Sequence, residues 1–174
     1  MLDKTYGDLL KMKTIIITII FVLAYIHSVI AFEIDGFKSG MSVQEAKKML
    51  ENYSFERMEV KDDFILASNV SGQGSNRLIA LGFCEEKLIQ FQKHLNPRFD
   101  YFTRLVEEKR KEFGKPIDAF SRPTDITSNI KSDSIEFIWK RENLFVSVSY
   151  TEFDTNNQLD LKYEIYNKCW EIPY

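Results

Sequence analysis

The stretch SIEFIWKRENLFVSVSYT, residues 134–151, decides the fold because apolar and polar residues alternate along it in two successive runs. A two-residue loop at positions 142–143 would pair position 139 with 146, 137 with 148 and 135 with 150. Opposite residues in an antiparallel pair share a face, so one register puts every large apolar side chain on the same side. The stretch therefore predicts a hairpin whose core side carries Ile135, Phe137, Trp139, Val146, Val148 and Tyr150.

Further strands are predicted on both sides of this hairpin. Residues 159–165 alternate Leu, Leu, Tyr and Ile with Asp160, Lys162 and Glu164, which predicts a third strand with one water-facing side. Residues 77–84 and 87–93 predict an earlier hairpin that is apolar on both faces. Its first face groups Leu78, Ala80, Ile89 and Phe91, and its second groups Ile79, Leu81, Phe83 and Leu88. Residues 64–68 are a short strand candidate, and residues 55–60 are a weaker one.

Two helices are expected. Ser42 and Glu45 match a capping box, and apolar residues recur behind them at helical spacing, which predicts a helix over 42–52. Asn96-Pro97 suits the start of a second helix, which Gly114 and Pro116 would end. Residues 121–132 are polar and contain Pro123, so a long loop is expected there.

The order helix-strands-helix-strands predicts a two-layer α+β domain, an antiparallel sheet with both main helices packed on one face. The two halves, each a helix followed by strands, form a candidate degenerate repeat, although their sequences barely match.

The N-terminal residues match an export signal. Lys11 and Lys13 precede an apolar run over 15–26, and small or β-branched residues end at Ala31, where cleavage is expected. The natural start is then Met12, and residues 32–174 form a single domain in the periplasm or outside the cell. The alternative is an uncleaved membrane anchor. The expected mature part keeps 20 basic and 24 acidic residues, interspersed, which argues against a nucleic-acid partner.

The chain has two cysteines, Cys84 and Cys169, and an even pair in an oxidising compartment predicts a disulfide. Two separate buried thiols are the alternative. A Cys84 nucleophile activated by His94, ten residues away, is the sharpest enzymatic alternative.

Composition speaks against most catalytic chemistry. Only His94 lies beyond the signal, so a multi-histidine metal site or a hydrolase triad lacks its residues. We therefore expect no catalytic residue, no cofactor and no metal site. A hydrolase that uses two carboxylates, or a purely structural protein, remains the alternative.

The two-sided apolar hairpin suggests binding. Ile79, Leu81, Phe83 and Leu88 form a candidate interaction patch, since exposed apolar patches mark interaction sites. The alternative is that residues 32–37 cover this hairpin and make it part of the core.

The layout also resembles small exported proteins of the outer-membrane-assembly SmpA/BamE kind and of the β-lactamase-inhibitor kind. The resemblance lies in residues 37–42 leading into Glu45 and Ala46, in residues 83–88, in residues 113–116 and in the Trp139 strand. It implies a non-catalytic envelope protein that binds another envelope or extracellular protein. The chain lacks the lipidated cysteine of the assembly lipoproteins. The expected function is thus an exported, non-catalytic protein-binding domain.

Overall fold

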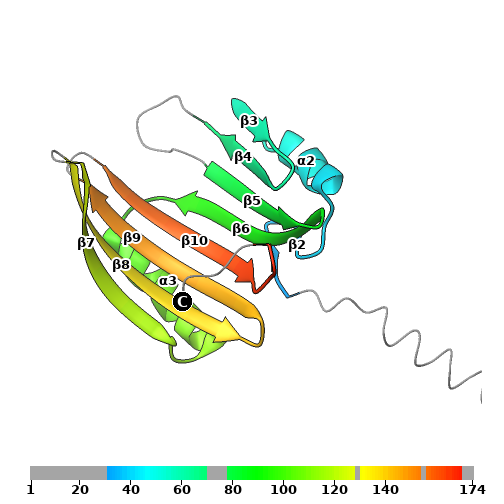
Figure 1. Ribbon diagram of the computed structural model, residues 1–174. Helices are drawn as coiled ribbons and strands as arrows, with labels where there is room; N and C mark the ends of the chain where they lie inside the picture. The colour runs from blue at the N-terminus through cyan, green and yellow to red at the C-terminus, as the bar shows by residue number, and fades with distance from the viewer. Residues whose placement is uncertain (1–30, 70–77, 128–129, 154–155, 170–174) are drawn as a thin grey trace, which may run out of the picture. The chain divides into compact units, whose positions relative to one another are not determined.

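A computed structural model describes residues 31–69, 78–127, 130–153 and 156–169 (Figure 1). The chain divides into two units, residues 1–30 and 31–174, and every described residue belongs to the second. The expected signal segment therefore lies outside the described residues, apart from Ala31. Within the described ranges, no helix is long and apolar enough to cross a bilayer.

The described residues of the second unit form ten strands and two helices. In chain order they are β1 (Glu33–Ile34), β2 (Phe37–Lys38), α2 (Val43–Glu51), β3 (Arg57–Val60), β4 (Phe64–Ser68), β5 (Leu78–Cys84), β6 (Lys87–Leu95), α3 (Phe99–Phe113), β7 (Asp118–Thr127), β8 (Ile130–Arg141), β9 (Leu144–Phe153) and β10 (Asn157–Ile165). Strands β1 and β2 form a small hairpin, and the other eight form one antiparallel sheet.

The sheet consists of two four-stranded meanders, β3 to β6 and β7 to β10. Its strand order is β3-β4-β5-β6-β10-β9-β8-β7, so the last strands of the two meanders lie side by side. We call this β6–β10 contact the seam; it places Phe91 opposite Tyr163. A helix precedes each meander, α2 the first and α3 the second (Figure 1).

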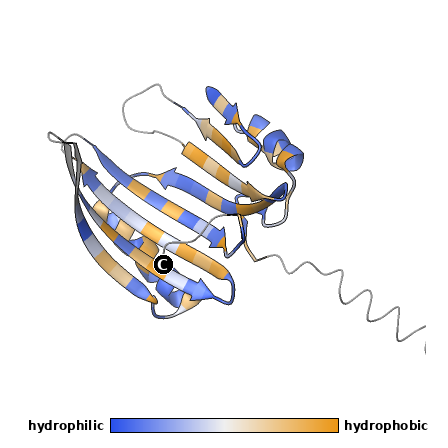
Figure 2. Cartoon of the chain, viewed as in Figure 1, coloured by the Kyte–Doolittle hydropathy of each residue, from blue (hydrophilic) through white to orange (hydrophobic). Residues whose placement is uncertain are grey.

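The hairpin at residues 134–151 has the predicted register. Trp139 faces Val146, Phe137 faces Val148 and Ile135 faces Tyr150, so these three pairings are confirmed. Trp139 and Val148 are fully buried, and the same core takes in Leu159, Leu161 and Tyr163 of β10. Figure 2 shows the alternation of polar and apolar residues along β8 and β10 from which this pattern arises.

The predicted two-layer α+β class is wrong: the unit is mostly β, and only one of its two helices packs along the large sheet. The α3 helix packs on β8 and β9, where Phe102 contacts Phe137 and Tyr150. The α2 helix touches the sheet at β6 and lies against the β1–β2 hairpin, where Met49 approaches the backbone of Gly36. The small hairpin inserts Phe37 into the core, 5.5 Å from the Phe91 ring.

The expected loop at residues 121–132 is also wrong, because most of this segment lies in β7 and in the start of β8. Pro123 pairs with Asp133 in that ladder. Proline lacks an N–H donor and is therefore tolerated in a sheet at an edge, and β7 is an edge strand. The polar composition reflects this edge position.

The predicted start of the first helix is confirmed, whereas the predicted start of the second helix is wrong. The Ser42–Glu45 capping box is confirmed, since the Ser42 backbone N–H donates to the Glu45 carboxylate at 2.8 Å. The second helix begins at Phe99, after an Arg98 N-cap that makes no side-chain capping bond, so Asn96 does not cap it. Its C-cap is Gly114, with φ +86°, and the Trp139 indole donates to the Gly114 carbonyl at 3.0 Å.

Candidate functional site

Cys84 and Cys169 form a disulfide, with Cα atoms 5.8 Å apart. The bridge joins the end of β5 to the segment that follows β10. Both sulfurs are committed to this bond, so the alternatives of two separate thiols and of a Cys84 nucleophile do not describe this structure. Disulfides persist in oxidising compartments, so the bridge fits a protein outside the reducing cytoplasm.

The candidate patch of Ile79, Leu81, Phe83 and Leu88 is not a surface. None of the four is more than 7% exposed, and all belong to the main core. Phe32 and Phe37 belong to the same core, and the Phe37 ring lies against Phe91, which pairs with Leu81, so residues 32–37 help to bury this hairpin.

The predicted faces of this hairpin were partly wrong as well. Phe91 pairs with Leu81 and therefore shares its face, not that of Ala80. A register shift between Gly82 and Phe83 then brings Leu88 opposite Phe83. A bulge of this kind moves side chains between faces, and strict alternation does not reveal it.

The opposite side of the sheet is the candidate site. Side chains that point away from α3 and the core form transverse rows across neighbouring strands. The three central rows are Ser149, Asp160 and His94; Ser147, Lys162 and Gln92; and Phe145, Glu164 and Gln90. We call this surface the helix-free face. Its centre is polar, in contrast to the apolar patch expected from the sequence.

One row contains a histidine–carboxylate pair. His94 Nε2 lies 3.0 Å from Asp160 Oδ1, and both side chains are largely buried. The Gln158 amide donates to Asp160 Oδ2 at 2.5 Å and lies 3.2 Å from His94 Nε2. His94 is thus held by neighbours on β10, which agrees with a structural role.

This row does not provide a hydrolase triad. A triad needs the histidine between the hydroxyl and the carboxylate. Here Asp160 lies between Ser149 and His94, which are two strands apart, or roughly 10 Å at the usual strand spacing. The carboxylates of Asp160 and Glu164 are four residues apart on β10, roughly 13 Å along a strand. That separation exceeds the roughly 5–9.5 Å between paired acid and base carboxylates in glycosidases.

The polar side of β10 is not water-facing as predicted. Asp160 is 8% exposed and Glu164 only 3%. Lys162 Nζ lies 2.8 Å from Glu164 Oε2, so the buried carboxylate has a cationic neighbour. Alternation along residues 159–165 shows which side chains share a face but not whether that face is buried, so the prediction missed this burial.

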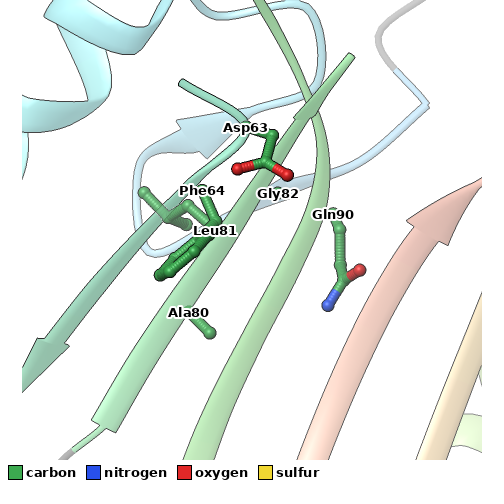
Figure 3. Close-up of a pocket in the computed structure, with 6 residues that line it drawn as sticks. All are labelled: Asp63, Phe64, Ala80, Leu81, Gly82 and Gln90. Carbon is green, nitrogen blue, oxygen red and sulfur yellow. The ribbon is translucent and has the colours of Figure 1, made fainter. Parts of the chain in front are cut away.

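A shallow hollow of about 380 Å³ lies beside these rows. Its lining comes from β4, β5, β6 and the turn before β4, namely Asp63, Phe64, Ala80, Leu81, Gly82 and Gln90. Figure 3 shows Gln90 on one side of β5, with Asp63 and Phe64 on the other. The small residues Ala80 and Gly82 open the space between them. No sequence motif marks this hollow, because its residues meet only through strand pairing.

A buried cation lies on the other side of the sheet. Lys109 of α3 is 6% exposed, and its Nζ is 2.6 Å from Glu112 Oε2. Burial lowers its pKa, but hydrogen bonding with Glu112 and Tyr163 outweighs this effect, so the net shift is upward. Burial also raises the pKa of the Tyr163 phenol, against the opposing influence of Lys109. This cluster joins α3 to β10 beneath the helix, so its arrangement is structural.

The described residues contain no group of three or more His, Cys, Asp or Glu arranged to hold a metal ion. No family model, curated protein or solved structure matches the chain. The candidate site therefore depends on its own geometry.

Proposed function

We propose that the chain is an exported, non-catalytic domain that binds another protein through the helix-free face. One observation carries the proposal: on a sheet face with no described helix over it, Gln90 and Gln92 of β6 are only half-buried and carry amide groups that can form hydrogen bonds. The match of the N-terminal residues to an export signal and the disulfide support a location outside the cytoplasm.

The chemistry of the face favours a protein partner. The net charge of −3 opposes binding to a nucleic-acid backbone. The hollow is too shallow to enclose a small molecule, since ligand pockets bury most of their ligand. A protein surface can hydrogen-bond with Gln90 and Gln92 and place one apolar side chain against Phe64 and Ala80.

The resemblance to exported envelope proteins points the same way, because such families imply binding without catalysis. Purely structural envelope proteins remain the competing class, and they would show no specific partner at this face.

Site-specific photo-cross-linking tests the proposal. A photoreactive residue replaces Gln92 at the centre of the face in cells that produce the protein, and the matched control replaces exposed Lys47 on α2. We expect a discrete protein adduct at position 92 and none at position 47. The captured protein, once purified, should bind the chain directly, and Gln92→Arg should weaken the affinity at least tenfold, while Lys47→Glu should not.

Equal adducts at both positions, or an affinity that Gln92→Arg leaves unchanged, would contradict binding through this face. Absence of any adduct at position 92 would favour the structural class.

A further inference from the structure

The hollow on the helix-free face has room for one inserted side chain. Phe64 of β4, Gly82 of β5 and Gln90 of β6 form one transverse row, because Gly82 pairs with each of the other two. Gly82 carries no side chain, so Phe64 and Gln90 face each other across two strand spacings, roughly 10 Å. Ala80, two residues back along β5, continues the same floor with a small side chain.

Asp63 gives this hollow a negative charge. Its backbone carbonyl accepts a hydrogen bond from the Phe83 N–H at 2.8 Å, which holds the residue beside the end of β5. Its side chain is exposed, and Figure 3 shows the carboxylate beside β5, with the Gln90 amide across the strand from it. Within the described part of the chain, no ion pair or hydrogen bond engages this carboxylate. An unpaired anionic group therefore lines the hollow together with an aromatic ring.

The Phe64 ring already attracts a cation of the chain itself. Lys61 Nζ lies 4.8 Å from the ring centroid, and the same nitrogen is paired with Glu59 at 3.1 Å. The residues that line the hollow do not include Lys61, and Glu59 balances its charge. A cation over an aromatic face is stabilised by the charge distribution of the ring. The ring, the Asp63 carboxylate and an amide oxygen thus all favour a cation in the hollow.

We propose that the hollow is the part of the helix-free face that takes an arginine side chain of the partner protein. The methylene stem lies along Phe64 and Ala80. The guanidinium group pairs with the Asp63 carboxylate and donates to the Gln90 side-chain oxygen. This inference rests on the proposed function, because it names the chemistry of the partner that docks there.

Other side chains match the hollow less well. Lysine would pair with Asp63, but only the planar guanidinium of arginine can both stack on an aromatic ring and bind a carboxylate through two N–H groups. An apolar side chain would contact Phe64 but would cover the Asp63 carboxylate without pairing it, which costs free energy. An acidic side chain would be repelled by Asp63.

A titration of the purified full-length chain, followed by nuclear magnetic resonance, tests this chemistry without the partner. The probes are blocked tripeptides, glycine-X-glycine, in which X is arginine, lysine, leucine or glutamate. We expect saturable shifts of the Gly82 and Gln90 amide resonances with the arginine peptide, and binding about two- to fivefold weaker with the lysine peptide. Leucine and glutamate peptides should produce no comparable shifts. Equal binding of the leucine and arginine peptides would overturn the preference for a cation, and no saturable shift at Gly82 would overturn the subsite.

Two neighbouring aspartates provide a matched pair of variants. Asp63→Asn removes the charge but keeps the size of the side chain and the backbone bond to Phe83. It should weaken binding of the arginine peptide about two- to fivefold, as expected for an exposed ion pair. Asp62→Asn removes the same charge from an exposed residue outside the lining and should leave the affinity unchanged. Equal effects of the two variants would show attraction by net charge alone and would contradict the subsite.

A second pair of variants tests the space. Ala80→Leu fills the hollow and should abolish the arginine-dependent shifts, whereas Ala119→Leu, at an exposed position on the edge strand β7, should not. Urea unfolding of both variants checks that they remain folded. An Ala80→Leu protein that is folded and binds the peptide like the wild type would place the binding elsewhere. If Ala80→Leu does not fold, the two aspartate variants decide the question.

The partner captured by cross-linking at position 92 separates this inference from the proposed function. Asp63→Asn should lower its affinity about two- to fivefold, and replacement of one arginine of the partner should lower the affinity for the wild type more than for Asp63→Asn. A captured partner that binds both forms equally would refute the arginine subsite and leave the docking function standing. Specific binding of the arginine peptide, with no partner captured at position 92, would refute the docking function and leave the chemistry of the hollow standing.

Discussion

The packing of α2 on the β1–β2 hairpin makes a sharp prediction at Gly36. This residue has φ +83°, and a Cβ added there would lie 2.7 Å from the Met49 methyl carbon. Gly40 has almost the same backbone angle, φ +82°, but an added Cβ would meet nothing within 4 Å. The two glycines therefore separate the effect of backbone strain from that of helix packing.

Both alanine substitutions should destabilise the domain. A side chain in left-handed backbone costs about 1–2 kcal/mol, and Gly40→Ala should show this effect alone. Gly36→Ala should lose about 0.5–1.5 kcal/mol more, the cost of pushing the Met49 side chain out of its rotamer. The expected order of unfolding free energies is wild type, then Gly40→Ala, then Gly36→Ala.

Urea unfolding, followed by tryptophan fluorescence, measures these free energies. A double-mutant cycle with Met49→Ala sharpens the test. The Gly36→Ala/Met49→Ala double variant should lose less unfolding free energy than the sum of the two single losses. For Gly40→Ala and Met49→Ala, the losses should be additive. If Gly36→Ala were no more harmful than Gly40→Ala, or if its effect did not depend on Met49, the packing of α2 on this hairpin would be refuted.

Three further predictions concern the core and the bridge. Replacing both cysteines by serine should lower the free energy of unfolding by about 4.5 kcal/mol, the loop-entropy value for a separation of 85 residues, and urea titration of oxidised and variant protein should show it. Because the pKa values of Lys109 and Tyr163 are both raised, each contribution to stability is complete below the unfolded-state values near pH 10 and is lost as the pH rises further. Thermal melts between about pH 8 and 11.5 should therefore show a fall in stability that Tyr163→Phe reduces; an equal fall in the variant would contradict the role of Tyr163. Trp139→Phe should cost about 1–3 kcal/mol, less than the 3–5 kcal/mol expected for Trp139→Ala, because it loses the hydrogen bond to Gly114 but keeps an aromatic ring; chemical denaturation of both variants checks the order.

Local patterns predicted the local parts of this fold well. The hairpin register at 134–151 followed from alternation and loop length, and the Ser42–Glu45 cap followed from four residues. Each depends on neighbours close in sequence.

Features that depend on distant neighbours were not predictable in the same way. Pro123 and its polar neighbours indicate a loop unless the segment is known to be a sheet edge. Asp160 and Glu164 alternate with apolar residues as the polar side of a water-facing strand would, yet both are buried in the folded sheet. Ile79 and Leu81 suggested a binding patch because residues 32–37, which join the same core, have too short a pattern for their position to be predicted.

The seam between β6 and β10 has a consequence for how the chain folds. Within each meander, successive strands pair with their chain neighbours, so little loop entropy opposes their formation. The seam instead joins residues such as Gln90 and Glu164, far apart in the sequence, and contacts of this kind slow folding. The disulfide ties together the same two regions, β5 and the end of β10. In an unfolded chain with an intact disulfide, the two regions that form the seam are already held close together, so this chain should refold faster than a reduced one. During first folding, the rate should therefore depend on whether the disulfide forms before or after β6 and β10 pair.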